Sequence, residues 1–234
     1  MKMDSIQLHW EERGHGEPLV LLHGNGEDGS YFRHQMACFS GKYRVMAVDT
    51  RGHGRSPRGS APFTIGTFAE DLRDFLDQRG LDRVHLLGFS DGGNIALTFA
   101  LRYPARLRSL ILNGANLFPG GVKRRVQLPI ILGYHAASLL ARLDPKAVPK
   151  RELLALMVEQ PDIPPAALAA LQVPTLVIAG TRDMIAESHT RLIHRSIPGS
   201  RLALVEGDHF IAAKQSGLFN KAVERFLDRL PQEV

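Results

Sequence analysis

The sequence of 234 residues contains a single cysteine, Cys38. One thiol cannot form an internal disulfide, so nothing here indicates an oxidising compartment. The opening segment, MKMDSIQLHWEERG, lacks the apolar core of a secretory signal peptide. The most apolar later stretch, Leu128–Leu143, contains His135 and Arg142 and is too short to cross a bilayer. We therefore expect a cytoplasmic protein with no membrane partner.

The chain also lacks any extended block of like charge. Its 29 basic and 24 acidic residues give a net charge of +5, but the only basic run is Lys123–Arg125. Three residues are too few for a nucleic-acid groove, and a solvated loop is the expected structure there. Cysteine, histidine and acidic residues do not recur at metal-ligand spacing. We expect no nucleic acid, no metal and no other cofactor, and the oligomeric state stays open.

What the sequence does contain is a core of ordinary size, with 44% hydrophobic residues. Short apolar runs alternate with helical patterns, which is typical of a mainly parallel sheet covered by helices on both faces. The expected strands cover residues 6–10, 19–22, 43–48, 84–87, 109–112, 175–179 and 202–205. The expected helices cover 67–79, with Thr67 as its N-cap, 92–102 and 215–230.

Residues 116–171 interrupt this alternation. They contain two or three helix-like stretches, several prolines and no convincing strand, and the following VPTLVIAG resumes the strand pattern. We interpret 116–171 as a helical cap inserted over one end of the sheet. Residues 1–115 and 172–234 then form the core.

The strongest chemical signal is a G-x-S-x-G motif at 88–92, between an apolar strand and a helix. That context is typical of a nucleophile elbow, in which Ser90 occupies a sharp turn. Gly88 and Gly92 avoid collisions across such a turn, and Gly93 permits close approach of the helix. Backbone N–H groups at the helix start face the developing negative charge. The motif therefore predicts Ser90 as a nucleophile.

A serine hydroxyl needs a general base and an orienting acid. His209 follows the last expected strand, and Asp183 follows the preceding one; such loops gather the site of an α/β sheet. Asp208 is a poorer candidate acid because it is adjacent to His209 and badly placed to reach the ring. The chain order Ser90, Asp183, His209 is that of an α/β-hydrolase triad.

The glycines at 24–29 offer a competing interpretation. Their G-x-G-x-x-G spacing follows an apolar run, and Asp49 lies 20 residues further on, as in a dinucleotide-binding turn. Glu27 and Asp28, however, would set two carboxylates against a pyrophosphate. Charge repulsion therefore disfavours a phosphate loop.

Taken together, the motifs resemble those of the α/β-hydrolase superfamily along nearly the whole chain. They are HGNG at 23–26, DTRGHGRS at 49–56, GFSDGG at 88–93, GTRD at 180–183 and GDHF at 207–210. The resemblance implies an α/β-hydrolase fold: a mostly parallel, twisted sheet of about seven to eight strands, helices on both faces and a short helical cap.

The resemblance also implies an oxyanion hole made of the backbone N–H groups of Asn25 and Asp91. The glycine loop is then the oxyanion loop, and Asp49, His23 and His53 are turn residues beside the site rather than metal ligands. Many relatives carry a proline shortly after the acid, and DMIAES at 183–188 has none.

The function expected is that of a serine hydrolase cleaving a small carboxylic ester through an acyl-enzyme. Carbon–carbon bond hydrolysis of vinylogous diketones is the enzymatic alternative, and a low-turnover small-molecule receptor is the alternative from another class. The substrate partner is a small molecule that the sequence does not name. Candidate apolar pocket walls are Phe89, Phe118, Tyr134, Met184 and Phe210, each of which also suits ordinary core packing.

The side chain of Asp91 has two interpretations. An acidic residue at a helix start is favourable through the helix dipole alone. Alternatively, its carboxylate faces the pocket and pairs with a cationic substrate such as an amino ester.

Overall fold

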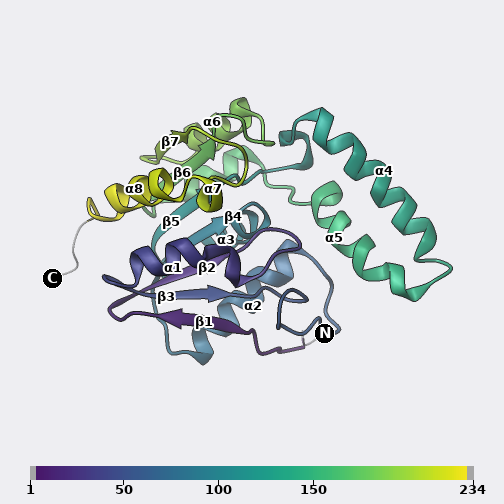
Figure 1. Cartoon of the computed structure of the whole chain (residues 1–234), viewed down its shortest axis with the longest axis horizontal. Helices are drawn as coiled ribbons and strands as arrows, with labels where there is room; N and C mark the ends of the chain where they lie inside the picture. Colours follow the sequence, from purple (N-terminus) through teal and green to yellow (C-terminus); the bar gives the residue numbers. More distant parts are fainter. Residues whose placement is uncertain (1–3, 231–234) are drawn as a thin grey trace.

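A single twisted sheet organises the computed structural model, which describes residues 4–230 (Figure 1). The strand order is β1-β3-β2-β4-β5-β6-β7, and only β1 runs antiparallel to its neighbour. The strands are β1 (Trp10–Arg13), β2 (Glu17–Leu22), β3 (Tyr43–Val48), β4 (Val84–Phe89), β5 (Leu107–Asn113), β6 (Thr175–Gly180) and β7 (Arg201–Val205). The predicted mostly parallel sheet is confirmed.

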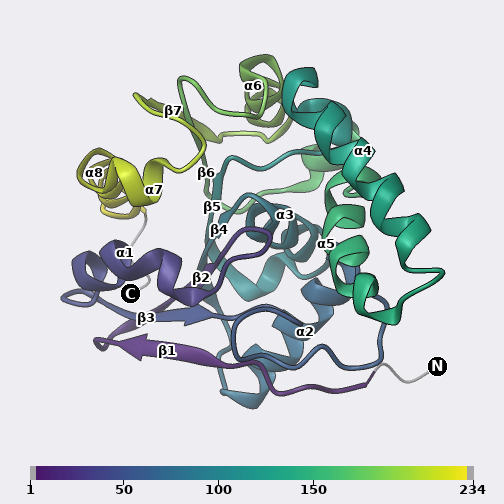
Figure 2. The same cartoon turned by 45° about the vertical axis from the view of Figure 1, so that its right-hand side comes forward.

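Helices cover both faces of this sheet, as Figures 1 and 2 show from two directions. On one face α2 (Ile65–Gln78), α3 (Asp91–Arg102) and α6 (Glu187–Ser196) contribute to one buried apolar cluster. On the other face α1 (Arg33–Phe39), α7 (Ile211–Lys214) and α8 (Ser216–Leu227) contribute to a second. The central strands are buried on both sides, which explains their near-continuous apolar sequences.

The predicted cap segment contains two α-helices, α4 (Arg124–Leu140) and α5 (Val148–Glu159), and three short 3-10 helices, η3 (Pro119–Gly121), η4 (Pro145–Ala147) and η5 (Pro165–Ala170). The two α-helices lie side by side, and α4 is the outer one in both views (Figures 1 and 2). Three short contacts attach α5 and its end to the rest of the chain. Asn25 Nδ2 donates to Leu153 O at 2.8 Å, Arg58 pairs with Glu152 at 2.6 Å, and Ile65 N donates to Gln160 Oε1 at 2.9 Å.

Several local predictions are wrong. The first strand is Trp10–Arg13, not 6–10, because His9 instead bonds the loop at 49–56: His9 N donates to Ser56 Oγ, and its carbonyl accepts from Asp49 N. Helix α2 begins at Ile65, and its N-cap is Thr64 rather than Thr67. Thr64 has extended backbone, and its Oγ1 accepts from Thr67 N at 3.0 Å.

The basic run at 123–125 is not a loop either. Lys123 is the N-cap of α4, and Arg124 and Arg125 form its first turn. Helices α1 and α6 have no counterpart among the predicted elements. The terminal residues 1–3 and 231–234 of the predicted core lie outside the described residues.

Candidate active site

Ser90 occupies the turn between the end of β4 and the start of α3. Its φ of 53° and ψ of −119° make it the only non-glycine residue with positive φ in the described range 4–230. Such a conformation costs about 1–3 kcal/mol. A Cβ at Gly88 would come within 2.1 Å of Gly92 O, and one at Gly92 within 2.1 Å of Leu22 O. The two glycines are therefore required by the turn that carries Ser90.

His209 lies between Ser90 and Asp183. Its Nε2 is 3.0 Å from Ser90 Oγ, and its Nδ1 is 2.6 Å from Asp183 Oδ1. Asp183 follows β6 and His209 follows β7, so neighbouring parallel strands deliver both side chains to the same edge of the sheet as Ser90. The histidine and the aspartate are both buried. The structure thus brings together the three side chains that the sequence selects.

Asp208 lies away from this histidine. Its Oδ1 accepts from Phe210 N at 2.9 Å, and its Oδ2 pairs with Lys214 at 2.5 Å. The hydrogen bond from Lys214 holds the pKa of Asp208 below its usual value. The carboxylate in contact with the His209 ring is that of Asp183.

The acid loop is held by the segment that leads into α4. Lys123 N donates to Met184 O at 2.9 Å, the Lys123 ammonium donates to Asp183 O, and Ala186 N donates to Gly121 O at 2.9 Å. These contacts hold the loop after Asp183, which contains no proline between residues 184 and 188. Sequence reasoning missed Lys123, because no local pattern links it to a loop 60 residues away.

Asn25 of the glycine loop lies opposite Asp91, the first residue of α3. Asn25 Nδ2 donates to Asp91 Oδ2 at 2.8 Å, and Asn94 Nδ2 donates to Asp91 Oδ1 at 3.3 Å. Burial raises the pKa of Asp91. Within residues 4–230, the backbone N–H groups of Asn25 and Asp91 make no hydrogen bond.

Glu27 completes the glycine loop. Its Oε2 accepts from Gly24 N at 3.2 Å, and burial raises its pKa. From the sequence, the Glu27 carboxylate serves only as an argument against pyrophosphate binding. In the structure it caps the loop that presents Asn25.

The five predicted pocket walls do not form one group. Phe89 and Phe210 lie beside His209, with ring centroids 4.8 and 5.5 Å from the imidazole. Phe118 instead packs edge-on against His189 at 4.6 Å. Tyr134 lies on α4, where its hydroxyl donates to Glu159 of α5. Met184 follows the acid, and its carbonyl accepts from Lys123 N.

His23, His53 and Asp49 serve the turns beneath the site. His23 Nδ1 donates to Gly24 O at 2.7 Å, and its Nε2 accepts from Thr50 N at 3.0 Å. Burial lowers the pKa of His23 to about 4, which keeps its ring neutral. Asp49 accepts from Gly29 N and Arg55 N. In the part of the chain that the structure describes, no three His, Cys, Asp or Glu side chains converge as metal ligands would.

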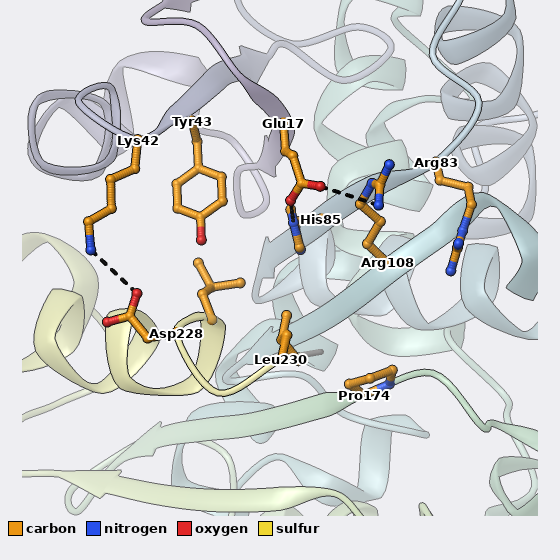
Figure 3. A pocket seen from close by; sticks show the side chains of 10 residues that line it. Glu17, Lys42, Tyr43, Arg83, His85, Arg108, Pro174, Asp228 and Leu230 are labelled. Atoms are coloured by element: carbon orange, nitrogen blue, oxygen red, sulfur yellow. Dashed lines mark hydrogen bonds and ion pairs between the residues drawn. The ribbon is translucent and has the colours of Figure 1, made fainter. Parts of the chain in front are cut away.

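A cavity of about 610 Å³ lies at the opposite edge of the sheet (Figure 3). It is lined by residues at the start of strands, including Glu17, Tyr43 and His85. Its charges largely neutralise one another, since Glu17 lies 3.3 Å from Arg108 and Lys42 lies 3.3 Å from Asp228. Along β4, His85 is separated from Ser90 by roughly 16 Å. This cavity is therefore distinct from the triad.

Comparison with known proteins agrees with this architecture. The model of the family described as "alpha/beta hydrolase fold" matches residues 17–135, just over half of the chain. The chain belongs to the α/β-hydrolase family. This membership confirms the resemblance that the motifs indicate.

Three known proteins illustrate the similarity. Human "Serine hydrolase BPHL" is 31% identical over 96% of this chain and 84% of its own. A "2-hydroxy-6-oxononadienedioate/2-hydroxy-6-oxononatrienedioate hydrolase" of Paraburkholderia phymatum is 37% identical over 53% of this chain and 44% of its own. The crystal structure of a hydrolase from Pseudomonas aeruginosa, 28% identical, has a TM-score of 0.78 and covers 95% of this chain and 94% of its own.

Proposed function

We propose that this protein is a serine hydrolase that cleaves a small carboxylic ester through an acyl-enzyme. The observation that carries the proposal is the position of His209, with one ring nitrogen 3.0 Å from Ser90 Oγ and the other 2.6 Å from Asp183. Those distances suit proton transfer from the hydroxyl and an orienting carboxylate behind the ring. The names of its hydrolase relatives support the same class.

In the proposed mechanism, Ser90 Oγ attacks the ester carbonyl carbon as its proton passes to His209 Nε2. Asp183 accepts the hydrogen bond from Nδ1–H and stabilises the imidazolium. The backbone N–H groups of Asn25 and Asp91 hold the oxyanion. Collapse of the intermediate breaks the C–O bond, and the alcohol leaves with the proton from His209.

Deacylation repeats these steps with water. His209 Nε2 takes a proton from water as its oxygen attacks the acyl carbon, and the same two N–H groups hold the second oxyanion. Collapse returns the proton to Ser90 Oγ and releases the carboxylic acid. The proposed steps use only residues of this chain, the substrate and water.

We further propose that residues 116–171 act as a cap that shapes the substrate pocket. The hydrogen bond from Asn25 Nδ2 to Leu153 O supports this, because it joins α5 to the oxyanion loop at 2.8 Å. Phe210 and Met184 are the proposed apolar walls closest to the triad. Phe89 is a weaker candidate, because it is only 1% exposed and its ring stacks on Tyr31 in the core. Phe118 and Tyr134 are weaker candidates, since their rings contact His189 and Glu159.

Hydrolysis of a carbon–carbon bond in a vinylogous diketone is the second candidate. It is favoured by the 37% identity to the Paraburkholderia hydrolase, whose match covers 53% of this chain. Ester hydrolysis and carbon–carbon bond hydrolysis would use the same proposed triad in this protein. The shape and polarity of the substrate pocket therefore decide between the two reactions.

Labelling with a fluorophosphonate and turnover of p-nitrophenyl acetate test the proposal together. We expect stoichiometric labelling that is lost in Ser90→Ala, and steady turnover beyond one acyl group per chain. Labelling followed by a single burst without turnover would indicate a receptor. A panel of short and long esters, lactones, thioesters and diketones then separates ester from carbon–carbon hydrolysis, because only the correct class gives the highest kcat/KM.

A further inference from the structure

The outer surface of α4 carries an exposed stripe of leucines. Five of the seven large hydrophobic side chains exposed in the described part of the chain lie on α4 or in the turn after it. They are Leu128, Leu132, Leu139, Leu140 and Leu143, with exposed fractions of 54%, 70%, 61%, 55% and 81%. At about 100° per residue, Leu128, Leu132 and Leu139 fall within ~40° of one another around the helix. We call these five residues the leucine stripe.

The leucine stripe faces away from the protein. Helix α4 packs on α5 through its other side, where Ala137 and Gln127 are buried and Gln127 Nε2 donates to Met157 O at 3.0 Å. Figures 1 and 2 both show α5 between α4 and the sheet. Helix α4 therefore carries its large exposed apolar side chains on the side that faces away from α5. The exposed His135 lies on the same face, about 20° from Leu128 around the helix. An exposed apolar surface of this kind marks a site that meets a partner or a lipid phase.

Cations flank the leucine stripe at both ends. Arg124 and Arg125 lie in the first turn of α4, and Arg142, Lys146 and Lys150 follow its end. All five are exposed, and no ion pair within residues 4–230 neutralises them. The one acidic residue in the turn, Asp144, accepts a hydrogen bond from Lys146 N at 2.9 Å. The stripe thus lies in a positive field.

The positive charge around the leucine stripe favours an anionic lipid surface over a second copy of the protein as its binding partner. A second copy paired through antiparallel α4 helices would place Arg124 and Arg125 opposite the partner's Arg142 and Lys146, where like charges repel. An anionic lipid surface satisfies both features, because acyl chains accept leucines while phosphate groups accept the cations. No helix within residues 4–230 is long and apolar enough to cross a membrane, so α4 would lie parallel to the surface.

We propose that the leucine stripe and its flanking cations dock this protein on anionic lipid surfaces. The expectation of no membrane partner rests on the lack of a signal peptide and of a spanning segment, and neither bears on an amphipathic helix surface. The proposal does not depend on ester hydrolysis, since binding requires neither Ser90 nor a substrate.

Vesicle co-sedimentation tests it, with pure phosphatidylcholine vesicles against vesicles containing 30% phosphatidylglycerol. We expect binding to the anionic vesicles that weakens in 1 M NaCl. Leu132→Ser/Leu139→Ser should lower the partition coefficient by ~10- to 100-fold. Arg124→Gln/Arg142→Gln should lower it about fivefold per cation removed, and only on anionic vesicles.

Matched controls come from α8, which lies elsewhere on the surface. Leu218 is 54% exposed, as is Leu128, and Lys221 is an exposed cation. Leu218→Ser and Lys221→Gln should leave partitioning unchanged. Absence of anionic-vesicle binding, or equal binding by stripe and control variants, overturns the proposal. So does a concentration-dependent dimer, measured by sedimentation equilibrium, that the leucine variants abolish.

Discussion

The side chains of Asn25 and Asp91 are joined by a hydrogen bond of 2.8 Å. These are the two residues whose backbone N–H groups we propose as the oxyanion hole. The same Asn25 amide reaches Leu153 O of α5 at 2.8 Å. One amide group therefore links the oxyanion loop, the elbow and the proposed cap.

This arrangement predicts that Asp91 has a positioning role. Asn25 and Asn94 both donate to its carboxylate, so Asp91→Asn should lower the free energy of unfolding by about 1.5–3 kcal/mol. An α-amino ester and its uncharged isostere should lose kcat/KM equally in this variant. Loss of an amino-ester preference in the variant alone would instead mean that the carboxylate pairs with substrate. Urea unfolding and parallel kinetics measure both effects.

Ser90→Ala, His209→Ala and Asp183→Asn should each reduce ester turnover by on the order of 10³-fold or more in folded protein. Double variants should lose little beyond the worse single one, because the three side chains act as a unit. Asp208→Asn is the matched control, since this carboxylate pairs with Lys214 rather than His209. Near-full activity of Asp183→Asn would show that the acid is another carboxylate. Steady-state kinetics with circular dichroism provide the test.

Lys123→Met should lower kcat on the order of tenfold with KM unchanged, which corresponds to about 1.4 kcal/mol. The Lys123 ammonium contacts the carbonyl of Asp183 and positions the acid loop without touching the ester. Arg124→Gln is the control from the next residue, whose side chain is exposed. A rise in KM with constant kcat would place Lys123 in substrate binding instead.

Acid should destabilise the fold through His23. Its folded pKa of about 4 lies below the ordinary value of 6.5, because burial disfavours the charged ring. The unfolded chain therefore binds a proton first, and stability present above pH 6.5 is lost as pH falls toward 4. The slope is up to about 1.4 kcal/mol per pH unit between those values. His23→Gln should flatten the curve in urea unfolding at pH 4.5–7.5, whereas His15→Gln at an exposed site should not.

The strands of the sheet and the three proposed catalytic residues could be predicted because each has a strong local sequence pattern. Buried parallel strands are continuous apolar runs, so β3 was predicted with its observed bounds. Ser90 sits in a strand–turn–helix pattern, and Asp183 and His209 follow strands, so chain order alone brought the three together. Strand β1 has no buried residue and three of its four residues are exposed, so its apolar pattern is weak, and the predicted strand 6–10 overlaps it only at Trp10.

Contacts between distant residues could not be predicted in this way. The bonds from Asn25 to Leu153 O and from Lys123 to Asp183 O join residues 128 and 60 positions apart. Neither bond leaves a trace in local periodicity. The choice of Thr67 over Thr64 failed for a related reason, because both threonines fit the cap pattern and only backbone geometry separates them.

The strained backbone conformation of Ser90 lowers the thermal stability of the protein, whereas the proposed reaction requires the Ser90 hydroxyl in that turn. Glycine at this position would relieve about 1–3 kcal/mol of strain against an entropic cost of about 0.5–1 kcal/mol. A library selected only for thermal tolerance should therefore enrich glycine at position 90 and discard the hydroxyl. Directed evolution of this scaffold needs simultaneous selection for turnover, because heat alone rewards the loss of the nucleophile.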